Sequence, residues 1–372
     1  MHIKSKVVLI FSGNNQRAVI AFCRYVLQEG ILFCIVANGK EDTIFESSYA
    51  NQVIATRRKN ELDFDSIINL CEICKRKYDV DEVLILPSTE FLNRFLLQHK
   101  EKLKEKKIEF ALCDEVTYSL VSDKYEFSEY CKSQNIPVPE DFDSPPKKYP
   151  YVMKPKYYGK GLSKINEKPV LVFSKNDLNK AGWIGNSSDY YFQEYVDGKS
   201  YYLLFYFFKN GKVECFSQEN LIQQDEGASM ILARSSTIHQ HEIAQQFIFA
   251  LKKINFSGLV MVEVKFDGEK FVMIEANPRL WGPSQLILDS NMTLFDAFAV
   301  DNGLKDKIIN HGYRSDEFYF WSGGLVANQR QQKQPKFYNY SKSQFFEDFE
   351  KLTTHDIYLK EDTIKIYLNE HN

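Results

Sequence analysis

Two glutamates able to bind a metal ion, Glu263 and Glu275, lie in a segment typical of two apolar strands on either side of Asp267-Gly268. Asn277 and Arg279 continue the alternation beyond the second strand. Carboxylate and amide oxygens are hard ligands of the kind that Mg²⁺ takes together with nucleotide phosphates. A guanidinium beside them can hold an anion. The segment therefore predicts a magnesium and phosphate site, and the alternative is a charged strand face exposed to solvent.

The turn between the two strands decides whether Glu263 and Glu275 share a face. A two-residue turn would pair Phe266 with Glu269 and place the glutamates on opposite, mixed faces. A three-residue loop would pair Phe266 with Lys270 and collect the apolar side chains on one face. The glutamates would then be diagonal neighbours, roughly 7–8 Å apart at the backbone, and would point into one cleft. In that register the apolar face carries Val260, Val262, Val264, Phe266, Val272, Ile274 and Ala276, and the other face carries Glu263, Met273, Glu275, Asn277 and Arg279.

Two segments earlier in the chain could bind other parts of a nucleotide. Lys154 ends a short apolar strand before Pro155, and Gly159-Lys160-Gly161 follows it. Glycines let backbone N–H groups approach phosphate oxygens, and lysines supply a point charge. The strand Tyr191–Val196, which ends at Gly198, could present backbone groups to a purine edge. A hairpin with a surface lysine is the alternative for the first segment, and an ordinary strand and turn for the second.

The elements that position these residues begin with an alternation of strands and helices in the first 115 residues. Short apolar runs at Val7–Phe11, Ile31–Ala37 and Glu82–Leu86 are separated by helical patterns, which indicates a parallel, Rossmann-like sheet. The first loop lacks the GxGxxG fingerprint. The loops at Gly13–Gln16 and Ser88–Glu90 follow strand carboxyl ends, where open α/β sheets bind ligands. A purely structural domain is the alternative.

The sequence pattern changes after Cys113. A short helix begins at Asp123-Lys124, and Ser144–Lys148 is the clearest linker. From Tyr149 onward, runs rich in β-branched and aromatic residues dominate, as expected for antiparallel strands. The stretch 312–372 is aromatic and charged but carries little motif content.

Taken in order, these segments resemble the ATP-grasp superfamily, most nearly its carboxylate–amine ligases and carbamoyl-phosphate-synthase-like members. The resemblance covers residues 1 to about 310 and implies an α/β protein. A Rossmann-like parallel sheet would precede a two-subdomain α+β fold with the nucleotide between the subdomains. The divisions would be 1–115 for the pre-ATP-grasp domain, 116–198 for a linker helix and small lid subdomain, 199–311 for the large subdomain with the metal site, and 312–372 for a C-terminal extension. The motifs that carry it are Asp123-Lys124, Lys154 with Gly159–Gly161, Gln193–Val196, Glu263 and Glu275–Arg279.

The resemblance also implies residue roles. Lys124 and Lys154 would contact ATP, and the loop of Gly159, Lys160 and Gly161 would close over its phosphates. Adenine would be read by a hinge made of Glu194, Tyr195 and Val196. Magnesium, or alternatively Mn²⁺, would be held by Glu263, Glu275 and Asn277.

Catalysis would fall to Arg279, which would stabilise a phosphorylated intermediate, and to Lys154. Many members carry an acidic residue for ribose two positions after the hinge glycine. Ser200 stands at that place in this chain, and Asp197 is the alternative.

We expect an ATP- and Mg²⁺-dependent ligase that joins a carboxylate to an amine, with amino-acid-like substrates, through an acylphosphate. Such a reaction needs positioning and charge neutralisation rather than a side-chain nucleophile. A kinase-like phosphotransferase and a non-catalytic nucleotide-binding module are the rivals. Candidate substrate contacts are Arg234, interpreted as a loop residue, Glu90 and Asn14.

Composition narrows the classes of partner. The 372 residues carry 47 basic and 50 acidic side chains, a balance that gives no electrostatic case for nucleic acid. The longest apolar run, Tyr201–Phe208, falls far short of the roughly 20 residues that span a bilayer, so no membrane partner is expected. Val7–Phe11 is too short for a signal-peptide core, which favours a cytoplasmic location. Seven cysteines in so long a chain argue against a disulfide framework, and a homodimer is left open.

Overall fold

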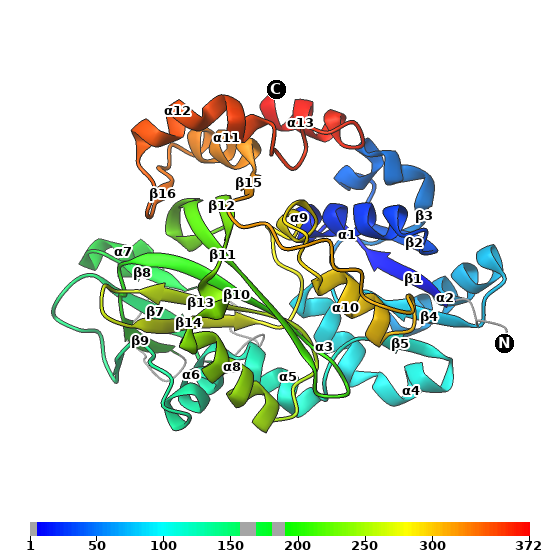
Figure 1. Cartoon of the computed structure of the whole chain (residues 1–372), viewed down its shortest axis with the longest axis horizontal. Helices are drawn as coiled ribbons and strands as arrows, with labels where there is room; N and C mark the ends of the chain where they lie inside the picture. Colours follow the sequence, from blue (N-terminus) through cyan, green and yellow to red (C-terminus); the bar gives the residue numbers. More distant parts are fainter. Residues whose placement is uncertain (1–5, 157–168, 181–189) are drawn as a thin grey trace.

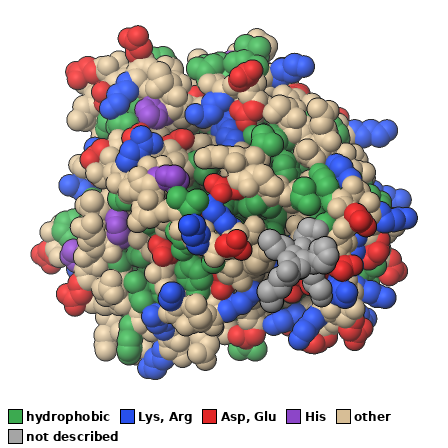
Figure 2. All heavy atoms as spheres, turned by 45° about the vertical axis from the view of Figure 1, so that its right-hand side comes forward, with side chains coloured by type: hydrophobic (Ala, Val, Ile, Leu, Met, Phe, Trp, Pro, Cys, Tyr) green, Lys and Arg blue, Asp and Glu red, His purple; other side chains and the backbone are tan. Residues whose placement is uncertain are grey.

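The computed structural model describes residues 6–156, 169–180 and 190–372, which form one parallel and two antiparallel sheets (Figure 1). No helix in these ranges is long and apolar enough to cross a membrane. Basic and acidic side chains are interspersed over the face seen in Figure 2.

Five parallel strands form the first sheet in the order β3-β2-β1-β4-β5, which confirms the Rossmann-like prediction. Strand order reverses between β1 and β4, and the loops after these two strands meet there. Asn15, after β1, donates side-chain hydrogen bonds to the carbonyls of Ser88 (3.3 Å), after β4, and of Leu280 (2.8 Å). The strands are β1 (Lys6–Phe11), β2 (Phe33–Asn38), β3 (Val53–Arg57), β4 (Glu82–Ile85) and β5 (Ile108–Phe110). Their helices are α1 (Gln16–Gln28), α2 (Phe64–Tyr78), α3 (Glu90–Gln98) and α4 (Lys100–Glu105).

Two helices then lead to the small antiparallel sheet. In α6 (Lys124–Ser133), which follows α5 (Glu115–Ser122), the side chain of Asp123 accepts hydrogen bonds from two backbone N–H groups of the first turn. This N-cap fixes where the helix begins and so places Lys124. The small sheet has the order β6-β9-β7-β8. Its elements are β6 (Asp141–Phe142), β7 (Tyr151–Pro155), β8 (Val170–Val172), α7 (Lys175–Lys180) and β9 (Tyr190–Glu194).

The large antiparallel sheet has two buried faces. Along its central strand β10, Leu203 and Phe205 pack in one core with α8, while Leu204 and Tyr206 pack in another with α1 and α10. The strand order is β14-β13-β10-β11-β12-β15, and β16 pairs with β11. The strands are β10 (Lys199–Phe207), β11 (Val213–Gln223), β12 (Met230–Ser236), β13 (Gly258–Phe266), β14 (Phe271–Asn277), β15 (Phe318–Phe320) and β16 (Lys336–Phe337). The helices are α8 (Glu242–Lys253), α9 (Gln285–Asp289) and α10 (Leu294–Asp301).

The β13–β14 hairpin corrects the predicted register. Phe266 pairs with Phe271, so the loop has one residue more than we predicted, and the glutamates are direct partners rather than diagonal neighbours. A β-bulge at Ile274 adds one residue to β14 and restores the shared face of the two glutamates. For the same reason Met273, predicted on the glutamate face, is buried in the core, and Ile274 lines the cavity instead.

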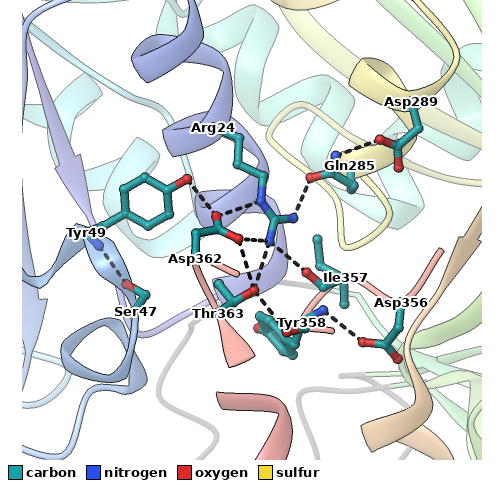
Figure 3. Close-up of polar contacts among 10 residues, drawn as sticks. All are labelled: Arg24, Ser47, Tyr49, Gln285, Asp289, Asp356, Ile357, Tyr358, Asp362 and Thr363. Carbon is teal, nitrogen blue, oxygen red and sulfur yellow. Dashed lines mark hydrogen bonds and ion pairs between the residues drawn. The ribbon is translucent and has the colours of Figure 1, made fainter. Parts of the chain in front are cut away.

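The C-terminal stretch completes the large sheet and connects it to the first domain. It supplies β15 and β16 and three helices, which lie along the top of Figure 1. Arg24 of α1 donates to Asp362 through two nitrogens (both 2.8 Å) and to the carbonyl of Ile357 (2.9 Å), and Tyr49 also donates to Asp362 (Figure 3). The division of the chain at 115, 198 and 311 stays a prediction. The helices are α11 (Ser322–Arg330), α12 (Lys342–Thr353) and α13 (Ile364–His371).

Candidate active site

A cavity of about 570 Å³ lies between the small sheet and the large sheet. Strands β7 and β9 contribute to one side of it, and β13, β14, the end of β11 and β16 contribute to the other. The predicted site residues that line it are Lys124, Lys154, Glu194, Tyr195, Val196, Glu263 and Glu275. The structure therefore brings the lysines, the hinge and both glutamates together from three separate parts of the sequence.

The two glutamates form an asymmetric pair. Burial and the negative charge of Glu275 raise the pKa of Glu263. The ammonium of Lys265 offsets only part of this increase. Burial alone would also raise the pKa of Glu275, but the ammonium of Lys124 and the amide of Asn277 (2.8 Å) lower it to about 2. Glu275 is therefore firmly ionised, while Glu263 carries the cost of the repulsion between the two carboxylates.

A short polar chain orients Glu263. Ser200, which is fully buried in β10, donates from its hydroxyl to Glu263 Oε1 (3.2 Å) and accepts from the side chain of Asn220 (2.8 Å). Ser200 thus supports the carboxylate of Glu263 and does not itself line the cavity. Within the part of the chain that the structure describes, no group of three or more His, Cys, Asp or Glu could hold a metal ion. A magnesium ion at this pair would take further oxygens from phosphate and water, as is usual for Mg²⁺.

Lys154 is buried, which excludes the surface-lysine alternative. It is 5% exposed, and its ammonium donates to the carbonyl of Ile274 at 3.3 Å. Burial and the nearby charge of Lys124 lower the pKa of Lys154 to about 8. A buried cation is stabilised best by an anion, so this side chain is suited to a phosphate.

The hinge begins with Glu194, the last residue of β9, whose backbone N–H donates to the carbonyl of Glu140 (2.8 Å). Gln193, just before it, is 1% exposed and donates to Asp141 (2.7 Å). Because a carboxylate only accepts, this bond fixes the amide orientation. The carbonyl oxygen of Gln193 then has no hydrogen-bond partner among the described residues. It is a buried acceptor at the hinge, of the kind that a purine amino group can satisfy.

Asn277 contacts the carboxylate of Glu275, and Arg279 contacts Asn277 in turn. Asn277 turns its amide nitrogen to Glu275, and its oxygen accepts from Arg279 (3.1 Å), which also donates to the carbonyl of Leu280 (2.9 Å). Lys124, Glu275, Asn277 and Arg279 thus form one continuous polar chain. Neither Asn277 nor Arg279 is among the residues that line the cavity.

The candidate substrate contacts lie outside this cavity. Asn14 is exposed in the loop after β1. Glu90 accepts from Arg94 and from the hydroxyl of Tyr118, both at 2.7 Å. Arg234 lies in β12, not in a loop as we interpreted it, and pairs with Glu219 (2.6 Å).

Some predicted site residues cannot be compared with the structure. Gly159, Lys160 and Gly161 lie outside the described residues.

Several lining residues received no role in the sequence analysis, among them Gln193, Lys265, Lys336 and Tyr338. Gln193 and Lys265 could have been found, because Gln193 precedes the hinge and Lys265 alternates with Glu263 along β13. Lys336 and Tyr338 come from the C-terminal stretch, which carries no motif.

Comparison with known proteins relates the chain to a family model and to several solved folds. A model of the ATP-grasp domain matches residues 121–283. The fold resembles that of biotin carboxylase from Campylobacter jejuni, solved with βγ-ATP, with a TM-score of 0.60 and 18% identity over 83% of this chain and 74% of that chain. N5-carboxyaminoimidazole ribonucleotide synthetase from Thermus thermophilus also gives 0.60, with 15% identity over 84% of this chain and 82% of that chain.

A third structure adds a bound metal and nucleotide. The biotin carboxylase domain dimer of Hydrogenobacter thermophilus 2-oxoglutarate carboxylase, in complex with MgADP, ADP and bicarbonate, gives a TM-score of 0.59 and 16% identity over 84% of this chain and 73% of that chain. A search of curated protein sequences finds no significant match. At these identities the likeness concerns the fold.

Proposed function

Because residues 121–283 match a model of the ATP-grasp domain, we propose that the chain is an ATP- and Mg²⁺-dependent ligase that joins a carboxylate to an amine. The observation that carries the proposal is the placement of Lys154. A buried ammonium beside two paired carboxylates, in a cavity that the hinge residues also line, is suited to the phosphates of a nucleotide.

ATP would lie along the cavity with its base at the hinge. Glu194, Tyr195 and Val196 would present backbone groups to adenine, and the free carbonyl of Gln193 adds a buried acceptor. Lys124 and Lys154 would hold the phosphates at the opposite end. Gly159-Lys160-Gly161 stays in the proposal as the loop that covers them.

Glu263 and Glu275 would hold the magnesium ion, with Asn277 behind them. The donor set fits, since two directly paired carboxylates repel each other and a divalent cation removes that cost. When bound, the ion would neutralise charge on the nucleotide phosphates. The same ligands fit Mn²⁺, which is also a hard cation.

The chain's own residues would then position the reactants. A carboxylate oxygen of the acid forms a bond to the γ-phosphorus as the bond to ADP breaks. The amine nitrogen attacks the carbonyl carbon of the acylphosphate, loses a proton, and phosphate leaves. Lys154 holds the transferred phosphoryl group, and Arg279 stabilises the charge on the intermediate. Small-molecule acids and amines are the proposed partners, with a homodimer as the proposed assembly and the cytoplasm as the proposed location.

An ADP-release screen separates this proposal from its rivals. Purified protein with ATP and Mg²⁺ is offered amino acids and small carboxylates, singly and in pairs with amines, and products are identified by mass spectrometry. A ligase releases ADP in proportion to an amide product and needs both acid and amine. A kinase-like enzyme needs one acceptor only, and a nucleotide-binding module binds ATP without turnover. Either result replaces the ligase proposal.

A further inference from the structure

The short strand β16 carries two side chains from the C-terminal extension into the cavity. It pairs antiparallel with the end of β11, Lys336 opposite Gln223 and Phe337 opposite Ile222. Phe337 packs against the cluster that contains Phe345. Because side chains alternate along a strand, Lys336 and Tyr338 face the other way, and both line the cavity.

The ammonium groups of Lys336 and of the buried Lys265 lie close to the same two tyrosine rings, those of Tyr195 and Tyr338. Its ammonium lies 4.9 Å from the ring centre of Tyr195 and 5.0 Å from that of Tyr338. The ammonium of Lys265 lies 5.3 and 5.8 Å from the same two centres. Lys336 also bonds to the hydroxyl of Tyr195, and Lys265 donates to the carbonyl of Val196 at 3.0 Å. These contacts fix both charges at the hinge.

The position of this pair along the cavity is set by β13. Lys265 is two residues from Glu263, so the two side chains project from the same face of the strand. Its bond to Val196 ties it to the hinge at the same time. The ammonium of Lys265 therefore lies between Glu263 and the hinge, and that of Lys336 is close to the same two tyrosine rings. In a nucleotide bound as proposed, the sugar is the part that connects those two ends.

Neither of the two residues considered for binding the ribose, Ser200 and Asp197, lines the cavity. Ser200, which stands two positions after the hinge glycine, is buried and bonded to Glu263. The side chain of Asp197 is 78% exposed, does not line the cavity, and pairs with Lys336 at 3.2 Å. Lys265 and Lys336, in contrast, both line the cavity and can donate hydrogen bonds.

We propose that Lys336, supplied by the C-terminal extension, and Lys265 hold the sugar of the bound nucleotide by donating hydrogen bonds to its hydroxyl oxygens. This inference rests on the proposed nucleotide site. It gives the extension a direct part in binding, because Lys336 reaches the cavity only while β16 is paired with β11.

Calorimetric titration with ATP analogues tests this assignment. The full chain is titrated with the Mg²⁺ complexes of a non-hydrolysable ATP analogue and of its 2′-deoxy and 3′-deoxy forms. A charge-assisted hydrogen bond corresponds to about a 10-fold or greater preference for the hydroxylated analogue over at least one deoxy form. In Lys336→Met, which keeps the apolar stem, the preference over the deoxy form that lacks the hydroxyl bonded to Lys336 should shrink to within about twofold, while any preference that depends on Lys265 should remain.

Matched variants make the result decisive. Lys365→Met removes the same charge from an exposed position on α13 and should keep the full preference. Lys336→Arg keeps donors and should restore part of it. An undiminished preference in Lys336→Met, or its loss in Asp197→Asn alone, would overturn the assignment. If the unmodified chain binds no nucleotide, the proposed function fails and the inference with it.

Discussion

Replacing Lys154 by methionine should weaken nucleotide binding and stabilise the ligand-free protein at the same time. The pKa of Lys154 falls from the usual 10.5 to about 8 because of burial and the charge of Lys124. A shift of about 2.5 units corresponds to roughly 3 kcal/mol of lost stability near pH 7, where the side chain is protonated in both the folded and unfolded chains. The side chain is 5% exposed, so solvent screening removes little of this cost. Loss of the bond to the Ile274 carbonyl offsets about 1 kcal/mol, leaving a net gain of about 2 kcal/mol.

The sign of the pH dependence follows from the depressed pKa. Between about pH 8 and 10.5 the unfolded chain binds more protons than the folded chain, so the stability of the native protein rises with pH in this window. Methionine does not titrate. The advantage of Lys154→Met should therefore be largest at pH 7 and smaller by about 2 kcal/mol at pH 9.5.

Urea denaturation at the two pH values, together with ATP·Mg²⁺ titration, measures all three quantities. Nucleotide affinity should fall by about 10- to 150-fold in the variant, the value of a charge-assisted hydrogen bond. Lys147→Met, in the loop before β7, is the control for loss of a lysine charge outside the cavity. A variant that is less stable than the parent at pH 7, or that binds ATP equally well, would refute the assignment of a buried phosphate-binding ammonium.

The polar chains around the cavity and the docking of the extension give three further predictions. Glu275→Gln should keep the fold, since the amide can still accept from Asn277, but should reduce Mg²⁺-dependent turnover at least about 100-fold in the ADP-release assay; activity within a few-fold of the parent would place the metal elsewhere. Ser200→Ala removes the donor to Glu263, so thermal unfolding should show a loss of about 1–3 kcal/mol in stability. The Mg²⁺ concentration needed for half-maximal activity should also rise, and an unchanged concentration would show that Glu263 is not a ligand of the metal. Arg24→Ala should cost about 3–5 kcal/mol in urea denaturation, because it leaves the carboxylate of Asp362 unpaired; a loss below about 1 kcal/mol, the scale of an exposed ion pair, would mean that this contact does not hold the C-terminal stretch.

Alternation in the sequence was enough to place both glutamates on one face, but not to give the register. An apolar face of valines specifies which side of β13 packs in the core with α8. Nothing in the residue types around Ile274 marks a bulge, and a bulge shifts every later residue of β14 to the other face. The loop length and the bulge compensate for each other, so the shared face came out right while the pairing was wrong. The error is visible at Met273, which is buried in the core, and at Ile274, which lines the cavity in its place.

Burial was the second property that the sequence could not supply. Lys154 precedes a proline, a pattern typical of an exposed strand end. In the fold β7 lies between β8 and β9, and β14 approaches closely enough for Ile274 to accept from Lys154. A lysine is rarely buried without a partner. Its burial depends on contacts 120 residues away in the sequence, which no local pattern encodes.

The C-terminal extension shows why a site can include residues that carry no motif. Lys336 and Tyr338 are ordinary surface residue types, and their place in the cavity depends on two docking contacts. The pairing of β16 with β11 orients them. The contact between Arg24 and Asp362 ties the end of the same stretch to the parallel sheet (Figure 3). The extension thus touches both the first domain and the hinge side of the cavity. Any movement between the domains must therefore break one of these contacts or carry β16 with it, so nucleotide binding and the docking of the extension should be thermodynamically linked.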